Sequence, residues 1–257
     1  MCQESGLIGF AKFAQLSNPS QYDIYHDGGV AEYIRVPYWQ LDLLPDSVSF
    51  EAAAKAHDAG VALQALKLAD LPPHSTVVVT APTGAMGVIT VRLAKQFAIS
   101  KLILIGRSPE RLEKVKTIST VPTEIVSLID PDIDIVDSVR KFAPQGVQAI
   151  IDYIPVGDTV SKLLPVMVTG GTLVHFGGNP TPLKVPMGAM MANCWRLISS
   201  RGNARVDTNQ ALKLLADGEL KIDDLFTHKY PFSDAEKAVD TIENRREPMW
   251  LSIIHVS

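Results

Sequence analysis

The chain has 257 residues, enough for one large domain or for one complete domain with part of a second. A net charge of −4 and a pI near 5.9 give no electrostatic reason to expect a nucleic acid or an anionic membrane as partner. No apolar run is long enough to span a bilayer, and the first ten residues lack the basic segment of a secretory signal. Two isolated cysteines, Cys2 and Cys194, fit a reducing compartment, so we expect a cytoplasmic protein.

The first 70 residues predict two short strands and a helix. Residues 28–37 are typical of a turn that leads into a strand, and residues 41–44, which Pro45 closes, predict a second strand. Ser49 is a favoured helix cap and precedes an Ala- and Leu-rich stretch, so we expect a helix over residues 50–68.

After Pro72 and Pro73, buried strands alternate with amphipathic helices. Residues 76–80 form a β-branched run of the kind that is buried on both faces of a parallel sheet. Further strands are expected at residues 102–105, 125–128, 149–153 and 172–176, separated by helices at residues 86–97, 109–116, 132–142 and 159–168. This alternation predicts an α/β fold with a doubly wound parallel sheet. The C-terminal part adds helices at residues 208–216 and 233–244 and a last strand at residues 250–256.

The loop after the first strand of this region has the chemistry of a phosphate-binding turn. Its sequence over residues 81–87 is APTGAMG, with alanine where the usual GxGxxG pattern has its first glycine. Gly84 lets the backbone approach a pyrophosphate, and Gly87 lets the following helix pack closely on the strand. The pattern alone also fits an ordinary turn, but a strand and a helix flank it. We therefore predict that a dinucleotide binds here, at a helix N-terminus, through Ala81, Thr83, Gly84, Ala85, Met86 and Gly87.

The end of the next strand indicates which dinucleotide binds. NAD sites usually place Asp or Glu there, where it accepts hydrogen bonds from the ribose hydroxyls. This sequence has Gly106, Arg107 and Ser108 instead, with Arg111 a little further along. A carboxylate would repel a 2′-phosphate, whereas glycine leaves space for it and arginine and serine bind it. The predicted cofactor is NADP(H), and the alternative is that Arg107 is a solvated surface charge.

Taken together, these motifs resemble the medium-chain dehydrogenase/reductase superfamily, which includes the zinc alcohol dehydrogenases and the quinone reductases. The resemblance covers nearly the whole chain, from GGVAEYIRVP and FEAAAKAHDAGVALQAL through VVVTAPTGAMGVITVRLAKQF, IGRSPERLEKVK and GGTLVHFG to FSDAEKAVDTIENRREPMWLSII. The segments IGRSP and LFTHKYPF are most similar to NADP-dependent secondary-alcohol dehydrogenases. The AxxGxxG loop is commoner among quinone and enoyl reductases.

The resemblance implies two domains. A GroES-like substrate domain would be built from residues 1–61 and 204–257, and a Rossmann domain from residues 62–203. It also implies that the GroES-like β domain is incomplete, because the chain begins inside it. The segment expected ahead of residue 1 is the one that carries a cysteine and a His–Glu pair for the catalytic zinc in zinc-dependent members.

A zinc site is doubtful on this basis. The third ligand position of the family corresponds to Asp58, which His57 precedes, and a catalytic zinc needs about three protein ligands. The alternative is that Asp58 caps or lines a helix near the cofactor. Ala62 and Ser252 replace a threonine and a basic residue that family members often have, and no catalytic residue is assigned.

Three functions remain open. The first is NADP(H)-dependent hydride transfer between an alcohol and a ketone. The second is a zinc-independent quinone or enoyl reductase, and the third a truncated, catalytically impaired cofactor-binding protein. A short-chain dehydrogenase is excluded because the sequence has no Tyr-x-x-x-Lys. The expected partner is a small-molecule substrate, and unpaired strand edges favour a homo-oligomer.

Overall fold

The computed structural model describes residues 24–244 and 247–256, which form parts of two compact units. The larger unit consists of Pro45–Thr227 with Pro248–Leu251. The smaller unit contains the described residues among Met1–Leu44, His228–Glu247 and Ser252–Ser257. Both chain ends therefore contribute to one unit, as the fold class predicted. Within the described residues, no helix is long and apolar enough to cross a membrane.

A six-stranded parallel sheet lies at the centre of the larger unit. Its strands are β1 (Ser75–Thr80), β2 (Ile99–Gly106), β3 (Thr123–Ser127), β4 (Val147–Asp152), β5 (Met167–His175) and β6 (Arg196–Ser199). Their order is β3-β2-β1-β4-β5-β6, which is that of a Rossmann fold, so the predicted fold class is confirmed. The order reverses between β1 and β4. Sheets of this kind bind ligands at the carboxyl ends of the strands beside such a reversal.

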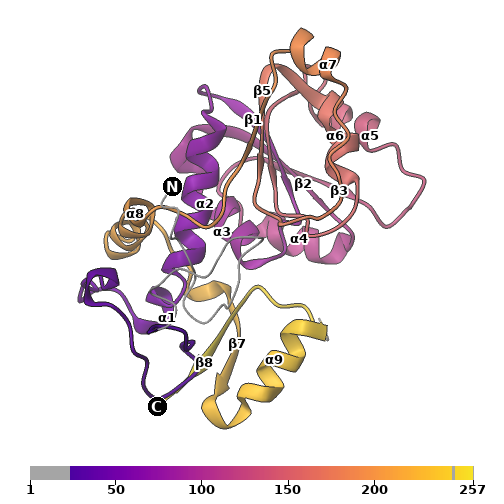
Figure 1. Ribbon diagram of the computed structural model, residues 1–257. Coiled ribbons are helices and arrows are strands. Elements are labelled where there is room, and N and C mark those ends of the chain that lie inside the picture. The colour runs from indigo at the N-terminus through magenta and orange to yellow at the C-terminus, as the bar shows by residue number, and fades with distance from the viewer. Residues whose placement is uncertain (1–23, 245–246, 257) are drawn as a thin grey trace. The chain divides into compact units, whose positions relative to one another are not determined.

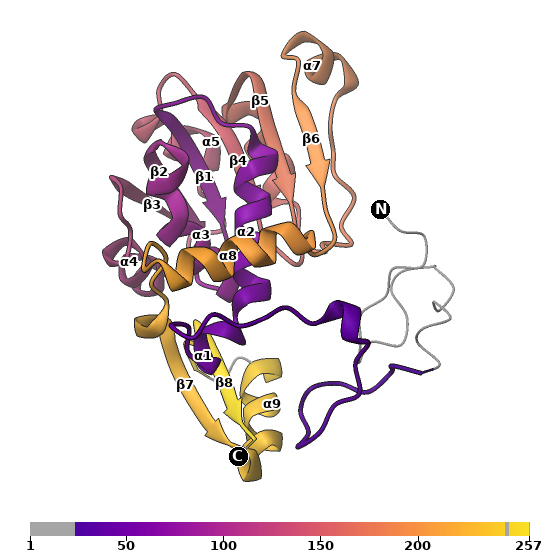
Figure 2. The same cartoon turned by 90° about the vertical axis from the view of Figure 1, so that its left-hand side faces the viewer.

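Helices cover both faces of the sheet. Right-handed crossovers put α3 (Ala85–Leu93) and α4 (Pro109–Thr117) on one face. They put α5 (Ile135–Phe142), α6 (Thr159–Leu163) and α7 (Met187–Ala192) on the other. Figure 1 shows α2 (Ala56–Ala69) and α3 on one side of the strands and α5 and α6 on the other. Helix α8 (Arg205–Ala216) packs across α2, as Figure 2 shows.

The core of the sheet follows from its β-branched and aliphatic strands. Val77, Val78 and Val79 of β1 are completely buried, as the uninterrupted apolar run predicted. On the face of α5 and α6, Val78 packs in one cluster with Ile150 of β4 and Leu163 of α6. Burial of each such side chain contributes roughly 1.5–3 kcal/mol to folding. The strand ends are therefore supported by a buried, closely packed layer.

The helix predicted over residues 50–68 is present in two pieces. Ser49 caps α1 (Phe50–Ala53) by accepting the N–H of Ala52 at 3.1 Å, and α2 begins three residues after α1 ends. Helix α2 ends at Ala69, close in sequence to the first residue of β1, and packs against β4 and β5. It therefore runs antiparallel to the strands, which places its first turn at their carboxyl ends.

The two strands predicted at residues 28–37 and 41–44 are wrong. Residues 28–37 form a bend and irregular chain, residues 41–44 form irregular chain, and the short helix η2 (Tyr38–Gln40) lies between them. A strand needs a neighbour to accept its backbone hydrogen bonds, and no described residue pairs with this segment. Tyr33 and Leu43 are accordingly 90% and 97% exposed, although their alternation suggested a buried face.

The last predicted strand is present as β8 (Leu251–His255). It pairs with β7 (Phe226–Pro231), which the sequence did not predict. Between them lie η6 (Phe232–Asp234) and α9 (Ala235–Asn244), close to the predicted helix. Strand β6 and helix α7 were also missed, because four and six residues are too short to show a period. The remaining short helices are η3 (Ala94–Phe97), η4 (Leu164–Val166) and η5 (Asp223–Leu225).

Candidate functional site

The turn between β1 and α3 leaves the N-terminus of the helix open. Gly84 is the N-cap residue of α3, and no side chain caps the first N–H groups of the helix. Gly84 is exposed, and the nearest atom that an added Cβ would meet is the Ala81 carbonyl oxygen, at 3.9 Å. Ala85 and Met86 follow within the first turn, half-buried. Unpaired N–H groups and the helix dipole together make such a terminus a site for an anion.

Two residues hold the shape of this turn. A Cβ on Gly87 would lie 2.6 Å from the Cα of Pro82, so glycine is needed for α3 to approach the loop. Ala81 has a φ of +46°, in the left-handed region that glycine favours, and its N–H donates to the Ile105 carbonyl of β2 at 2.9 Å. Alanine therefore keeps a glycine-like conformation at the first position of the glycine pattern, at a cost of about 1–2 kcal/mol. Thr83 lies half-buried in the same turn.

The end of β2 lies beside this loop. A Cβ on Gly106 would be 3.8 Å from the Cδ of Pro82. Arg107 is exposed and, among the described residues, forms no ion pair. Ser108 caps α4 by accepting the N–H of Arg111 at 3.3 Å. The predicted 2′-phosphate residues thus share one turn beside the predicted pyrophosphate loop.

The acidic residue of that turn is already paired. Glu110 lies in the first turn of α4, and its carboxylate accepts a hydrogen bond from the Lys114 ammonium at 2.8 Å. This contact lowers the pKa of Glu110 below its usual value. The carboxylate has its own counter-ion, so the charge of Arg107 is left available to a ligand.

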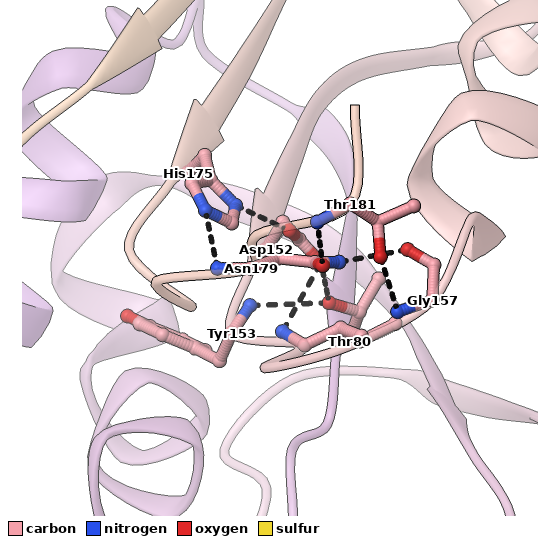
Figure 3. A network of polar contacts seen from close by, with 8 residues as sticks. Thr80, Asp152, Tyr153, Gly157, His175, Asn179 and Thr181 are labelled. Carbon is pink, nitrogen blue, oxygen red and sulfur yellow. Dashed lines mark hydrogen bonds and ion pairs between the residues drawn. The ribbon is translucent and has the colours of Figure 1, made fainter. Parts of the chain in front are cut away.

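A row of polar side chains ends the central strands on both sides of the reversal (Figure 3). Thr80, Asp152 and His175 are the last residues of β1, β4 and β5, and Asp152 pairs in register with His175. The Thr80 hydroxyl donates to Asp152 Oδ1 at 2.5 Å, and His175 Nδ1 lies 2.6 Å from Asp152 Oδ2. The N–H of Ile154 donates to Oδ1 at 3.3 Å. Asp152 is completely buried, and these donors satisfy both of its oxygens.

The same contacts determine which nitrogen of the His175 ring carries the proton. Nε2 accepts the N–H of Asn179 at 3.3 Å, so Nδ1 carries the proton and donates it to Asp152. Asn179 links the loop after β5 to the loop after β4, because its side-chain N–H donates to the Gly157 carbonyl at 2.7 Å. Its side-chain oxygen accepts the Thr181 N–H at 2.9 Å, and the Thr181 hydroxyl accepts the Gly157 N–H at 3.1 Å.

Tyr153 connects this row to α3. Its N–H donates to the Thr80 hydroxyl at 3.2 Å, and its own hydroxyl lies 2.8 Å from that of Thr90. Thr90 donates to the Met86 carbonyl at 2.8 Å, so the Tyr153 hydroxyl is the donor to Thr90. Burial raises the pKa of Tyr153 well above its usual range, so the phenol stays neutral. The network thus runs from the phosphate-loop helix to the loop after β5.

Sequence reasoning missed this network. Polar residues that close buried strands, in VVVT, IID and LVH, are the signal that was present. A cavity of about 300 Å³ opens beside the row, on the face covered by α6. Its wall combines apolar residues such as Leu173 and Leu183 with His175 and Ser199.

The predicted zinc ligand has a different partner. Asp58 lies in the first turn of α2, with its carboxylate 3.6 Å from the Lys55 ammonium, and both side chains are mostly buried. A Cβ on Gly202 would lie 3.7 Å from the ring of the neighbouring His57. Within residues 24–244 and 247–256, no three His, Cys, Asp or Glu side chains gather in a possible metal site. The described residues therefore do not supply the ligands of a catalytic zinc. Cys2 lies outside them.

The strand order, the open helix terminus at the reversal and the polar strand ends define a Rossmann domain of the nucleotide-binding class. The family model for zinc-binding dehydrogenases matches residues 85–217, just over half of the chain. The chain belongs to the zinc-binding dehydrogenase family.

Similar proteins include several sugar-alcohol enzymes. The probable D-xylulose reductase A of Aspergillus fumigatus is 29% identical over 223 residues, which cover 85% of this chain and 61% of that protein. Sorbitol dehydrogenase 1 of Saccharomyces cerevisiae is 26% identical over 217 residues, covering 83% and 60%. The chain thus spans less than two thirds of the length of these relatives.

Solved structures share the fold. One from Sinorhizobium meliloti 1021, with NADP bound, has a TM-score of 0.80 at 24% identity and covers 90% of this chain and 67% of its own. The alcohol dehydrogenase TADH of Thermus sp. ATN1 has a TM-score of 0.77 at 23% identity and covers 90% and 68%. At these identities the likeness concerns the fold alone.

Proposed function

We propose that the chain is an NADP(H)-dependent oxidoreductase that transfers hydride between its cofactor and an alcohol or ketone. The observation that carries this proposal is the end of β2, where Gly106, Arg107 and Ser108 stand in place of a ribose-binding acid. This turn lies beside the open N-terminus of α3. Relatives named for D-xylulose and sorbitol support a polyol or another secondary alcohol as the substrate class.

The chain's own residues have defined tasks in this proposal. The N–H groups of Ala85 and Met86 bind the pyrophosphate, Gly84 leaves room for it, and Gly87 keeps α3 close to the loop. Ala81 and Thr83 shape the turn. The loops after β4 and β5 lie at the same carboxyl edge of the sheet and would orient the bound cofactor there. When bound, NADP(H) supplies or accepts the hydride.

The 2′-phosphate would be held at the start of α4. Arg107 offers a guanidinium that forms no ion pair within the described part of the chain, and Arg111 lies in the first turn of α4. Ser108 already accepts the N–H of Arg111, so its hydroxyl proton is free to be donated to a phosphate oxygen. A guanidinium and a hydroxyl together favour a phosphate over a ribose hydroxyl at this place.

Cofactor titration tests the proposal. NADPH and NADH are titrated into the purified chain by calorimetry, and NADPH is expected to bind at least about tenfold tighter, the worth of one charge-assisted contact. Oxidation of sorbitol, xylitol and simple secondary alcohols with NADP⁺ is then followed at 340 nm. Equal affinities for the two cofactors would contradict the assignment. Tight NADPH binding without turnover of any substrate would instead support the impaired cofactor-binding protein.

A metal-independent quinone or enone reductase is the second candidate, and the Lys55–Asp58 pair favours it. The Lys55 ammonium is the counter-ion of the Asp58 carboxylate, so this carboxylate does not need a metal ion to balance its charge. We expect the purified chain to contain no stoichiometric zinc and any turnover to resist chelators. Elemental analysis that finds one zinc per chain, lost together with activity in Asp58→Ala, would exclude this candidate.

A further inference from the structure

The loop after β4 (residues 153–158) and the loop after β5 (residues 176–186) touch at the carboxyl edge of the sheet. A Cβ on Gly177 would lie 2.1 Å from the Ile154 carbonyl oxygen, so the two backbones meet with no room for a side chain. Both the N–H and the carbonyl of Gly157 are engaged by side chains of the other loop, from Thr181 and Asn179. Asn179 itself is held through its N–H by the ring of His175 (Figure 3).

We propose that His175 is the positioning residue that holds these two loops together, and that it does so as the neutral imidazole with its proton on Nδ1. The inference rests on the proposed function, because the loops lie at the carboxyl edge of the sheet, where the dinucleotide is proposed to bind. His175 touches no reacting atom in this proposal. It acts through Asn179, and its consequence is a cofactor affinity that falls as His175 becomes protonated.

The direction follows from the hydrogen bonds of the ring. Nδ1–H donates to Asp152 in either charge state, and Nε2 accepts the Asn179 N–H when the ring is neutral. Protonation places a second N–H on Nε2, directly against the N–H of Asn179. Two donors cannot bond to each other, so this contact is lost while the bond to Asp152 remains. The loops then lose the anchor that orients Asn179 toward Gly157.

The charges around the ring are few. From β4, Asp152 faces Nδ1 at 2.6 Å. From α6, β6 and the loop after β5, the described cavity wall is neutral, with Val160, Leu183 and Ser199. Asp158, the N-cap residue of α6, pairs with Lys162 of that helix at 3.2 Å. Asp152 is thus the charged group that faces His175 in the described structure.

The network also reaches the phosphate loop. Thr80 donates to Asp152 and accepts the Tyr153 N–H, and the Tyr153 hydroxyl leads through Thr90 to the Met86 carbonyl. One connected set of hydrogen bonds therefore reaches from Asn179, in the loop after β5, to Met86 in the first turn of α3. Losing the Asn179 contact is expected to weaken NADPH binding roughly fivefold, the usual worth of one such hydrogen bond.

Two substitutions separate the hydrogen-bonding role of His175 from its titration. The amide of His175→Gln can donate to Asp152 and accept from Asn179, but it does not protonate. His175→Leu removes both bonds. His74→Gln is the matched control, because His74 is exposed at the amino edge of the sheet. NADPH affinity is measured for all four proteins from about pH 8 to about pH 5.5.

The 2′-phosphate of NADPH also titrates near pH 6, so the differences between proteins are compared at each pH. Wild type and His74→Gln are expected to lose roughly fivefold more affinity on acidification than His175→Gln. His175→Gln should match wild type at pH 8, whereas His175→Leu should bind weakly throughout. An identical pH dependence in wild type and His175→Gln would overturn the inference. A wild type that binds no NADPH would instead overturn the proposed function.

A second measurement tests His175 without the cofactor. The ¹⁵N chemical shifts of its imidazole should show the Nδ1–H tautomer at neutral pH. Protection factors for amide exchange at Gly157, Asn179 and Thr181, which correct for the intrinsic pH dependence of exchange, should fall on acidification in wild type by more than in His175→Gln. A ring with its proton on Nε2, or protection factors that match those of the Gln variant, would refute the positioning role whatever the chain binds.

Discussion

The candidate site has two flanks at the carboxyl edge of the sheet, one at β1 and β2 and one at β4 and β5. The first is built mainly from backbone groups and the second from side chains. At β1 and β2 the site is mostly backbone, with an uncapped helix N-terminus at Gly84 and glycine at Gly87 and Gly106. At β4 and β5 it is a side-chain network around the buried Asp152 and His175, which are 23 residues apart in sequence. A backbone site depends on the local chain. A side-chain network depends on the register between strands that are distant in sequence. Substitutions in the first flank should therefore mainly change cofactor affinity, and substitutions in the second should mainly change stability.

The largest effect is expected at the backbone flank, from Gly84→Val. Gly84 has φ −92° and ψ 169°, an extended conformation that valine adopts readily, so the fold should be kept. The branched side chain would fill the open space before α3, and dinucleotide affinity should fall by at least about a hundredfold because the pyrophosphate contacts are lost. Circular dichroism and calorimetric titration measure the two properties.

Gly188→Val is the control for that substitution. Gly188 lies in α7, and an added Cβ there would meet no atom within 4 Å. It should leave affinity unchanged. Native circular dichroism with undiminished binding in Gly84→Val would show that the phosphate lies elsewhere.

The strand, turn and helix of this flank are also the elements that the sequence predicts well. The β-branched run before residue 81, the glycines at Gly84 and Gly87 and the helical stripe after them lie within one short stretch. Their spacing alone indicates strand, phosphate turn and helix. Even Ala81, which departs from the glycine pattern, takes the left-handed conformation that the turn requires.

The second flank shows why the rest escaped prediction. Thr80, Asp152 and His175 become neighbours because β1, β4 and β5 are adjacent in register, an order that the sequence of elements does not give. The prediction of a strand at residues 28–37 failed for a related reason. Their alternating pattern suits a strand, but a strand forms where a partner accepts its hydrogen bonds, and no described residue does so.

At the side-chain flank, Asp152→Asn should mainly destabilise the fold. The new amide N–H₂ would face the hydroxyl of Thr80 or the Nδ1–H of His175, which leaves a buried donor unpaired. We expect a loss of about 2–3 kcal/mol in the free energy of unfolding, measured by urea denaturation. Asp158→Asn is the matched control, because that exposed carboxylate pairs with Lys162 at the surface, and it should cost less than about 0.5 kcal/mol. Equal losses in the two variants would contradict the network.

A smaller and more selective effect is expected from Arg107→Asp. The substitution exchanges an attraction for a repulsion at the predicted 2′-phosphate, so the preference for NADPH should narrow by about tenfold or reverse. Stability should not change, because Arg107 is exposed. Lys141→Asp makes the same change of net charge on α5, away from the β2 turn, and should leave the preference as it is. An unchanged ratio of NADPH to NADH affinity in Arg107→Asp would mean that the arginine is a solvated surface charge.

The smallest effect, and the one that joins the two flanks, is expected from Tyr153→Phe. The ring stays, and the hydrogen bond to Thr90 is lost, so the variant should be about 1 kcal/mol less stable at neutral pH. Tyr38→Phe is the control, because Tyr38 is 79% exposed and should change little. A deficit of the same size in both variants would mean that the buried hydroxyl contributes nothing of its own.

The pH dependence of that deficit has a definite sign. The folded pKa of Tyr153 is raised, so its contribution to stability is fully present below about pH 10, where an unfolded tyrosine is still protonated. Above that pH the unfolded chain releases the phenol proton and the folded chain keeps it. Wild type should then lose up to about 1.4 kcal/mol per pH unit relative to Tyr153→Phe, so the two stabilities should converge and cross as pH rises beyond 10. Urea unfolding at neutral pH and near pH 11 measures this, and a constant difference would show that Tyr153 ionises normally in the folded protein.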